Sequence, residues 1–291
     1  MRHLRLLPLF AMPAALAPCA GGQTLEGRLE ARRDGRVGLS YAAREDVCGM
    51  GTTYLRIGSG TFFGDSWTMS NGDWTGSTIC ERGPIRVLLT RAEGQTIGIR
   101  VGVGNVTWPA GTTDVGAVAA SQAAGYSLGL AARADGRLGR EALLPAVLAD
   151  SAQVAHGLLE LARNRSLSRG LREGAVGWLG RELGSAEAAQ EGEIAAALRR
   201  LAEDGEEAAG IRTRAVSALA RTDGAGTPAL VALAESPDPA VRRAALGGLG
   251  RSVDPRAREV VRRAARDQTL PEPVRVDAIR GVGGRDATAK D

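Results

Sequence analysis

Residues 241–250 read VRRAALGGLG, and the pattern recurs three times elsewhere in the second half of the chain. The other copies are LREGAVGWLG at 171–180, IRTRAVSALA at 211–220 and VRVDAIRGVG at 274–283. Each has an apolar residue, Arg, two variable residues, Ala, an aliphatic residue, two variable residues, an aliphatic residue and a small one. Apolar residues at spacings of four, one and three lie on one face of an α-helix. The copies therefore predict four amphipathic helices.

Each copy follows another stretch with helical periodicity, at 158–163, 194–203, 228–235 and 257–266. A turn separates the two helices of a unit, as in SPDP at 236–239. A helical hairpin of this size cannot bury its apolar face alone, and stacking of hairpins buries it. We therefore expect a short α-solenoid over residues 151–291. Its buried positions should include Val176, Val216, Leu246 and Ile279.

The stretch DPAVRRAALGGLG at 238–250 resembles the HEAT-like repeat, including the variant named after phycobiliprotein lyases. The resemblance covers about residues 150–285. An insertion is expected around residues 184–192, because about forty residues separate Arg172 from Arg212. The layout of the whole chain resembles exported bacterial HEAT-repeat proteins, and this likeness implies no activity.

One arginine recurs at the same position of each repeat, as Arg172, Arg212, Arg242 and Arg275. In HEAT-like families the equivalent arginine reaches turn carbonyls or an acid of the neighbouring repeat, so the resemblance implies a structural role. Positions that vary between repeats are better candidates for recognition of a partner. We single out Arg243, Arg262, Arg263 and Trp178.

The charge of the predicted solenoid changes along its length. Residues 185–235 hold nine acids and five arginines, whereas residues 236–291 hold eight acids, eleven arginines and Lys290. This polarity favours a protein partner of mixed charge. Over the whole chain the net charge of +4 falls to +2 without the first twenty residues, and acids alternate with arginines throughout. A nucleic-acid partner is not expected, because it would require a concentrated basic face.

Two enzymatic interpretations fail on the residues themselves. The lyase variant implies chromophore attachment, but the matched residues are packing positions. HEAT-repeat deoxyhypusine hydroxylases bind two irons through His-Glu pairs, whereas this chain has only His3 and His156. We therefore expect a non-enzymatic interaction or scaffold module with no catalytic residues, metal or cofactor. An enzyme of unrecognised type stays an alternative.

Residues 1–20 have the layout of a secretory signal peptide, with Arg2 and Arg5 before a short apolar stretch. The prediction is export to the periplasm or the extracellular space. A second interpretation is an outer-membrane lipoprotein with lipid on Cys19, although Pro18 departs from the small residue expected there. No later run of eighteen apolar residues exists, so no membrane span is predicted.

Residues 21–115 are expected to form a β-rich domain, followed by a helical bridge at 116–150. Alternating apolar residues predict a strand at 36–41 and a hairpin at 85–89 and 96–103, with Ile97, Ile99, Val101 and Val103 on one face. In an oxidising compartment Cys48 and Cys80 should form one disulfide. Metal binding would need more ligands and a redox site usually has C-x-x-C. The predicted fold class is α+β.

Residues 58–77 are rich in Gly, Ser, Thr and Asn and predict a long loop or an irregular hairpin tethered by the disulfide. Four aromatic residues interrupt this stretch: Phe62, Phe63, Trp67 and Trp74. They either fill the core of the small domain or bind a partner or a sugar. Both interpretations remain open at this stage.

Overall fold

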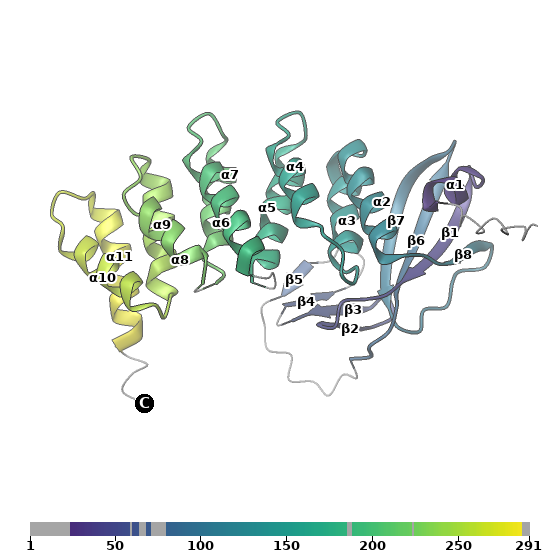
Figure 1. Ribbon diagram of the computed structural model, residues 1–291, viewed down its shortest axis with the longest axis horizontal. Helices are drawn as coiled ribbons and strands as arrows, with labels where there is room; N and C mark the ends of the chain where they lie inside the picture. Colours follow the sequence, from purple (N-terminus) through teal and green to yellow (C-terminus); the bar gives the residue numbers. More distant parts are fainter. Residues whose placement is uncertain are drawn as a thin grey trace, which may run out of the picture.

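A computed structural model describes residues 24–58, 60–63, 68–70, 80–184, 188–222 and 224–286. The N-terminal part is rich in strands, and the rest is a row of helical hairpins that ends at the C-terminus (Figure 1). This is the α+β architecture that the sequence predicts, with a small β-rich region and a helical repeat stack.

The first sheet has the strand order β7-β6-β1-β8. It is made of β1 (Gly35–Tyr41), β6 (Ile85–Ala92), β7 (Gln95–Val103) and β8 (Thr112–Ala117). β1 pairs antiparallel with β6 and parallel with β8. The β6–β7 hairpin turns on Glu93 and Gly94, which both have positive φ. Because this turn has only two residues, β6 continues to Ala92 and β7 begins at Gln95, and the strands are longer than the predicted 85–89 and 96–103.

The prediction that Ile97 shares one face of β7 with Ile99, Val101 and Val103 is wrong, because the exposed fraction of Ile97 is 59%. The pairing of β6 with β7 shifts between Thr90 and Arg91, so Arg91 pairs with Thr96 and Thr90 with Gly98. Ile97 is the extra residue of this β-bulge, and a bulge reverses the alternation of side chains. Thr96 faces inward instead, and its hydroxyl lies 2.7 Å from the hydroxyl of Tyr126.

The second sheet has the order β2-β3-β4-β5 and projects beside the helical stack (Figure 1). Its strands are β2 (Val47–Met50), β3 (Tyr54–Ile57), β4 (Gly60–Phe63) and β5 (Thr68–Ser70). The predicted disulfide joins Cys48 to Cys80. Residues 58–77, predicted as a loop or an irregular hairpin, contain the two short antiparallel strands β4 and β5.

The four aromatic residues of this segment lie largely outside the described part of the chain. Trp67 and Trp74 are not described, and neither are the side chains of Phe62 and Phe63. Both interpretations of these residues therefore stay predictions.

After the short helix α1 (Leu25–Glu30), the described helices pair into five hairpins. They are α2 (Ala120–Arg133) with α3 (Gly136–Val147), α4 (Ala155–Arg163) with α5 (Arg169–Leu183), α6 (Ala188–Glu203) with α7 (Ala209–Leu219), α8 (Gly226–Leu233) with α9 (Pro239–Arg251), and α10 (Pro255–Arg266) with α11 (Glu272–Asp286). The second helices pack in a row, α3 on α5, α5 on α7, α7 on α9 and α9 on α11. The residues expected as a bridge thus contribute a hairpin that stacks like the others.

The apolar face of the repeat is buried between successive units. Val176 and Val216 are fully buried and Leu246 is 1% exposed. The prediction is wrong for the equivalent Ile279, which is 55% exposed. The cause is its place in the stack, because no further hairpin packs on α11 within the described residues.

The first sheet is fixed to the stack through α3 and the segment after it. The buried hydroxyl of Tyr41 donates to the carbonyl of Pro145 at 2.6 Å. The backbone N–H of Arg44 donates to the carbonyl of Leu148 at 3.1 Å, and that of Asp150 donates to Ala42 at 3.0 Å. These backbone contacts hold the β-rich part against the first hairpin and so set the position of the second sheet beside α5.

Candidate functional site

The recurring arginines lie inside the stack, between one hairpin and the next. Arg172 donates from Nε to the carbonyl of Ala162 at 2.9 Å and pairs with the carboxylate of Glu207. Arg212 donates to the carbonyl of Glu207 at 2.5 Å and pairs with Asp238. Each guanidinium therefore binds a carbonyl of its own repeat, from the end of α4 for Arg172 and from the turn before α7 for Arg212, and an acid from the turn of the following repeat.

The hydrogen bonds of the recurring arginines differ towards the C-terminal end of the stack. Arg242 donates from Nε to the carbonyl of Ser236 at 2.8 Å. Hydrogen bonds from Thr269 lower the pKa of Asp267, and the nearby charges of Arg242 and Arg275 lower it further. The buried Nε of Arg275 has no hydrogen-bond acceptor within the described residues. We name Arg172, Arg212, Arg242 and Arg275, with their acids, the arginine ladder.

The acids of the arginine ladder are held in their charged form. Burial would raise the pKa of Glu207, but hydrogen bonds from Arg172 and from the N–H of Ala208 outweigh it, and the net pKa is lowered. The same balance applies to Asp238, where burial is outweighed by the N–H groups of Val241 and Ala240 and by Arg212. Asp238 also caps α9, accepting from Ala240 N–H at 2.7 Å.

The four residues singled out for partner binding do not form one site. Arg243 pairs with Asp277 of α11, so its charge is used between two repeats. Arg262 and Arg263 are exposed on α10, and their side chains have no hydrogen bond or ion pair in the described ranges. Trp178 is half-buried near the end of α5. Of these four, only Arg262 and Arg263 lie next to each other with exposed side chains that are unpaired in the described ranges.

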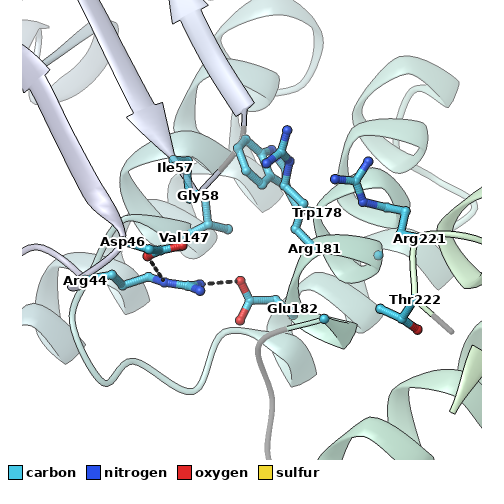
Figure 2. A pocket seen from close by; sticks show the side chains of 12 residues that line it. Arg44, Asp46, Ile57, Gly58, Val147, Trp178, Arg181, Glu182, Arg221 and Thr222 are labelled. Carbon is cyan, nitrogen blue, oxygen red and sulfur yellow. Dashed lines mark hydrogen bonds and ion pairs between the residues drawn. The ribbon is translucent and has the colours of Figure 1, made fainter. Parts of the chain in front are cut away.

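Trp178 instead lines a pocket where the second sheet meets the stack (Figure 2). The pocket has a volume of about 210 Å³ and lies between β3 and the C-terminal ends of α5 and α7. Its charged lining residues are Arg44, Asp46, Arg181, Glu182 and Arg221. Figure 2 shows Arg44 between Asp46 and Glu182 on one side, with Trp178, Arg181 and Arg221 on the other.

The two sides of the pocket differ in electrostatics. On one, Arg44 donates to Asp46 at 3.2 Å and to Glu182 at 2.8 Å, and burial raises the pKa of Glu182 despite this pairing. On the other, burial and then the charge of Arg221 lower the pKa of Arg181. Burial also lowers the pKa of Arg221, with a further contribution from the charge of Arg214. Positive charge is therefore concentrated on the side of Trp178.

The sequence analysis missed Arg181 and Arg221, although a signal was present. Both follow their ten-residue copies directly, and Arg251 follows the third copy in the same way. Extension of the repeat by one position would have identified them. Arg44 carries no such signal, because it comes from the other part of the chain.

The described residues meet the requirements of neither a metal site nor a membrane-spanning helix. Within them, no three His, Cys, Asp or Glu side chains are grouped closely enough to hold a metal ion. His156 is exposed and lies 3.2 Å from Glu160, one helical turn away. None of the described helices combines the length and the apolar character that a membrane crossing needs.

Comparison with known proteins identifies the repeat type. The HEAT repeat family model matches residues 227–288, and this confirms the predicted type of repeat. A designed armadillo repeat protein is similar at 15% identity and a TM-score of 0.31, over 56% of this chain and 74% of that chain. Another, in complex with the peptide (KR)4, has 16% identity and a TM-score of 0.31 over the same shares. A search of curated proteins found no match.

Proposed function

We propose that this chain, whose C-terminal half is a stack of HEAT-like repeats, is a non-enzymatic module of the cell envelope that binds a partner protein through the solenoid. The observation that carries the proposal is the contrast between the two sets of arginines. Arg172 and Arg212 of the arginine ladder pair with acids of the following repeat, whereas the side chains of Arg262 and Arg263 are exposed and form no ion pair within the described residues.

The exposed faces of the first helices differ from one repeat to the next. The exposed charges of α6 balance, whereas those of α10 are mostly positive. α6 exposes Glu193, Arg199, Arg200 and Glu203, and α10 exposes five arginines and a single acid: Arg256, Arg258, Arg262, Arg263, Arg266 and Glu259. Complementary charge on a partner would orient it along the stack and accelerate its association. We therefore propose a partner that places an acidic surface on α10.

The location in the cell envelope rests on the sequence of the N-terminus and on the disulfide. A signal peptide and a cystine both suit an oxidising compartment. The alternative is an outer-membrane accessory protein with lipid on Cys19. The mass of the mature N-terminus separates the two, because a diacylated Cys19 supports anchoring and a free terminus beyond residue 19 excludes it.

A matched pair of variants tests the binding surface. Arg262→Glu with Arg263→Glu reverses two charges on α10, and Arg199→Glu with Arg200→Glu makes the same change at the aligned positions of α6. Crosslinked capture from envelope extracts should lose the partner with the α10 variant and retain it with the α6 variant. The salt dependence of capture should also become weaker for the α10 variant. Equal capture by the two variants, both folded by circular dichroism, would refute the proposed surface.

A further inference from the structure

We infer that a second pocket, between α1, α2 and the β6–β7 turn, binds a free amino acid with an apolar side chain. The pocket would recognise both the carboxylate and the ammonium group of this ligand. It lies at the opposite end of the molecule from α10 (Figure 1). The inference therefore goes beyond partner binding by the solenoid and does not depend on it.

The size and lining of this pocket suit a small polar molecule. Its volume is about 390 Å³, within the range of about 300–1,000 Å³ that is usual for small-molecule sites. Leu29 of α1 and Leu130 of α2 contribute buried apolar surface to its wall. Polar groups converge on the same space, from the charged side chains Glu26, Glu30, Arg91 and Arg133 and the hydroxyls of Thr96 and Tyr126.

Arg91 is a buried cation that has no carboxylate partner in the part of the chain that the structure describes. It is only 7% exposed. Its guanidinium donates to the carbonyls of Arg32 and Gly94, at 2.8 and 2.5 Å. A third hydrogen bond, of 3.2 Å, goes to the hydroxyl of Thr96. All three acceptors are neutral, and a guanidinium has five N–H groups, so an anionic ligand can still accept from Arg91 and balance its charge.

The hydroxyls of Thr96 and Tyr126 supply a further donor beside Arg91. They lie 2.7 Å apart, so one of them donates to the other. Whichever hydroxyl donates, the other keeps a hydrogen for which the described residues offer no acceptor. Both residues are only 8% exposed, and a buried donor without an acceptor is costly. One carboxylate could accept from this hydroxyl and from Arg91 together.

The two helices add charges of both signs. Glu26 and Glu30 lie one turn apart on α1, and their side chains form no hydrogen bond or ion pair in the described ranges. The side chain of Arg133, in the last turn of α2, has none there either. The pocket thus offers acceptors for an ammonium group as well as donors for a carboxylate. An amino acid carries both groups, and an apolar side chain would contact Leu29 and Leu130.

The test titrates the mature protein with amino acids in a calorimeter. The probes are L-leucine, L-methionine and L-phenylalanine. Two analogues of leucine separate its charged groups, because leucinamide lacks the carboxylate and 4-methylpentanoate lacks the ammonium group. At least one amino acid should bind, and for leucine each analogue should bind at least about tenfold more weakly. Absence of binding by all three amino acids at millimolar concentration would overturn the inference.

Substitutions then locate the bound amino acid. Arg133→Gln, Tyr126→Phe and the double change Glu26→Gln with Glu30→Gln should each weaken binding by about tenfold. Arg163→Gln is the matched control, since Arg163 is exposed in the last turn of α4 as Arg133 is in that of α2, and it should leave binding unchanged. Arg133, Glu26 and Glu30 are exposed, so their variants should fold even if Tyr126→Phe does not. Full binding by the folded variants would contradict the assignment.

Other ligand chemistries are outcomes of the same experiment. If 4-methylpentanoate binds as tightly as leucine, the site recognises a carboxylate alone, and the amino-acid inference is overturned. If leucinamide binds as tightly as leucine, the carboxylate is not recognised, and the inference is overturned as well. Failure of amino-acid binding with partner capture still dependent on α10 removes only this inference. Failure of partner capture with amino-acid binding intact removes only the proposed function.

Discussion

Glu207 lies at the centre of the arginine ladder, and its replacement gives the most direct test of how the repeats are joined. Its carboxylate pairs with Arg172, its carbonyl accepts from Arg212, and its Oε1 accepts from the N–H of Ala208 at 2.8 Å. The exposed fractions of Arg172 and Glu207 are only 6% and 5%. Glu207→Ala leaves the guanidinium of Arg172 buried without its carboxylate. Removal of one partner from a buried pair costs about 3–5 kcal/mol.

The adjacent Glu206 supplies a matched control. Its carboxylate lies 3.2 Å from Arg165, and its side chain is 85% exposed. Exposed pairs contribute about 0.2–1 kcal/mol, so Glu206→Ala should have a small effect. Both variants remove a glutamate from the same turn, and they differ in burial and in their partner.

The measurement is urea unfolding followed by circular dichroism at 222 nm, with hydrogen exchange of α5 and α7 as a local readout. Exchange should accelerate in both helices for Glu207→Ala and in neither for Glu206→Ala. Replacing the whole pair, with Arg172→Met and Glu207→Leu, should recover most of the lost stability, because no buried charge is left unpaired. The reasoning is refuted if Glu207→Ala costs no more than Glu206→Ala.

Three further outcomes are expected. Because folding lowers the pKa of Glu207, its carboxylate stabilises the fold fully above the unfolded pKa of about 4.3, and this stabilisation is lost as the pH falls through the folded pKa. Urea unfolding midpoints measured from pH 3 to 7 should therefore fall less steeply at acid pH for Glu207→Gln than for the wild-type protein. Tyr41→Phe should cost about 1–3 kcal/mol in urea unfolding, since the buried carbonyl of Pro145 loses its donor, and an unchanged midpoint would contradict this. Replacement of Cys48 and Cys80 by Ser should cost about 3–4 kcal/mol, and hydrogen exchange should locate the loss in the second sheet rather than in the stack.

The helical half was largely predictable because its information is local and repeated. A period of 3.6 residues, four copies and proline-bearing turns such as 236–239 all indicate the same hairpins. What the pattern does not contain is the position of each unit in the stack. Ile279 has the same sequence context as Leu246, yet it is exposed because its burial depends on the next hairpin.

The β-rich part and the pocket were harder to predict for a different reason. The bulge at Ile97 depends on the register with β6, and register is a property of two strands rather than of one. The pocket requires Arg44 to meet Glu182, 138 positions later, and this contact follows from the docking of the first sheet on α3. Neither residue has a local signal for that meeting.

The arginine ladder also gives the stack a direction. Arg172 and Arg212 each reach forward to an acid contributed by the following unit, Glu207 and Asp238. During synthesis, therefore, the arginine of each unit stays in contact with water and without its acid until the following unit has been made and packs on it. Consolidation should proceed from the N-terminal to the C-terminal units, and a shortened chain should fray from its new end. The units are not interchangeable building blocks, because a glutamate and an aspartate differ in reach by one methylene.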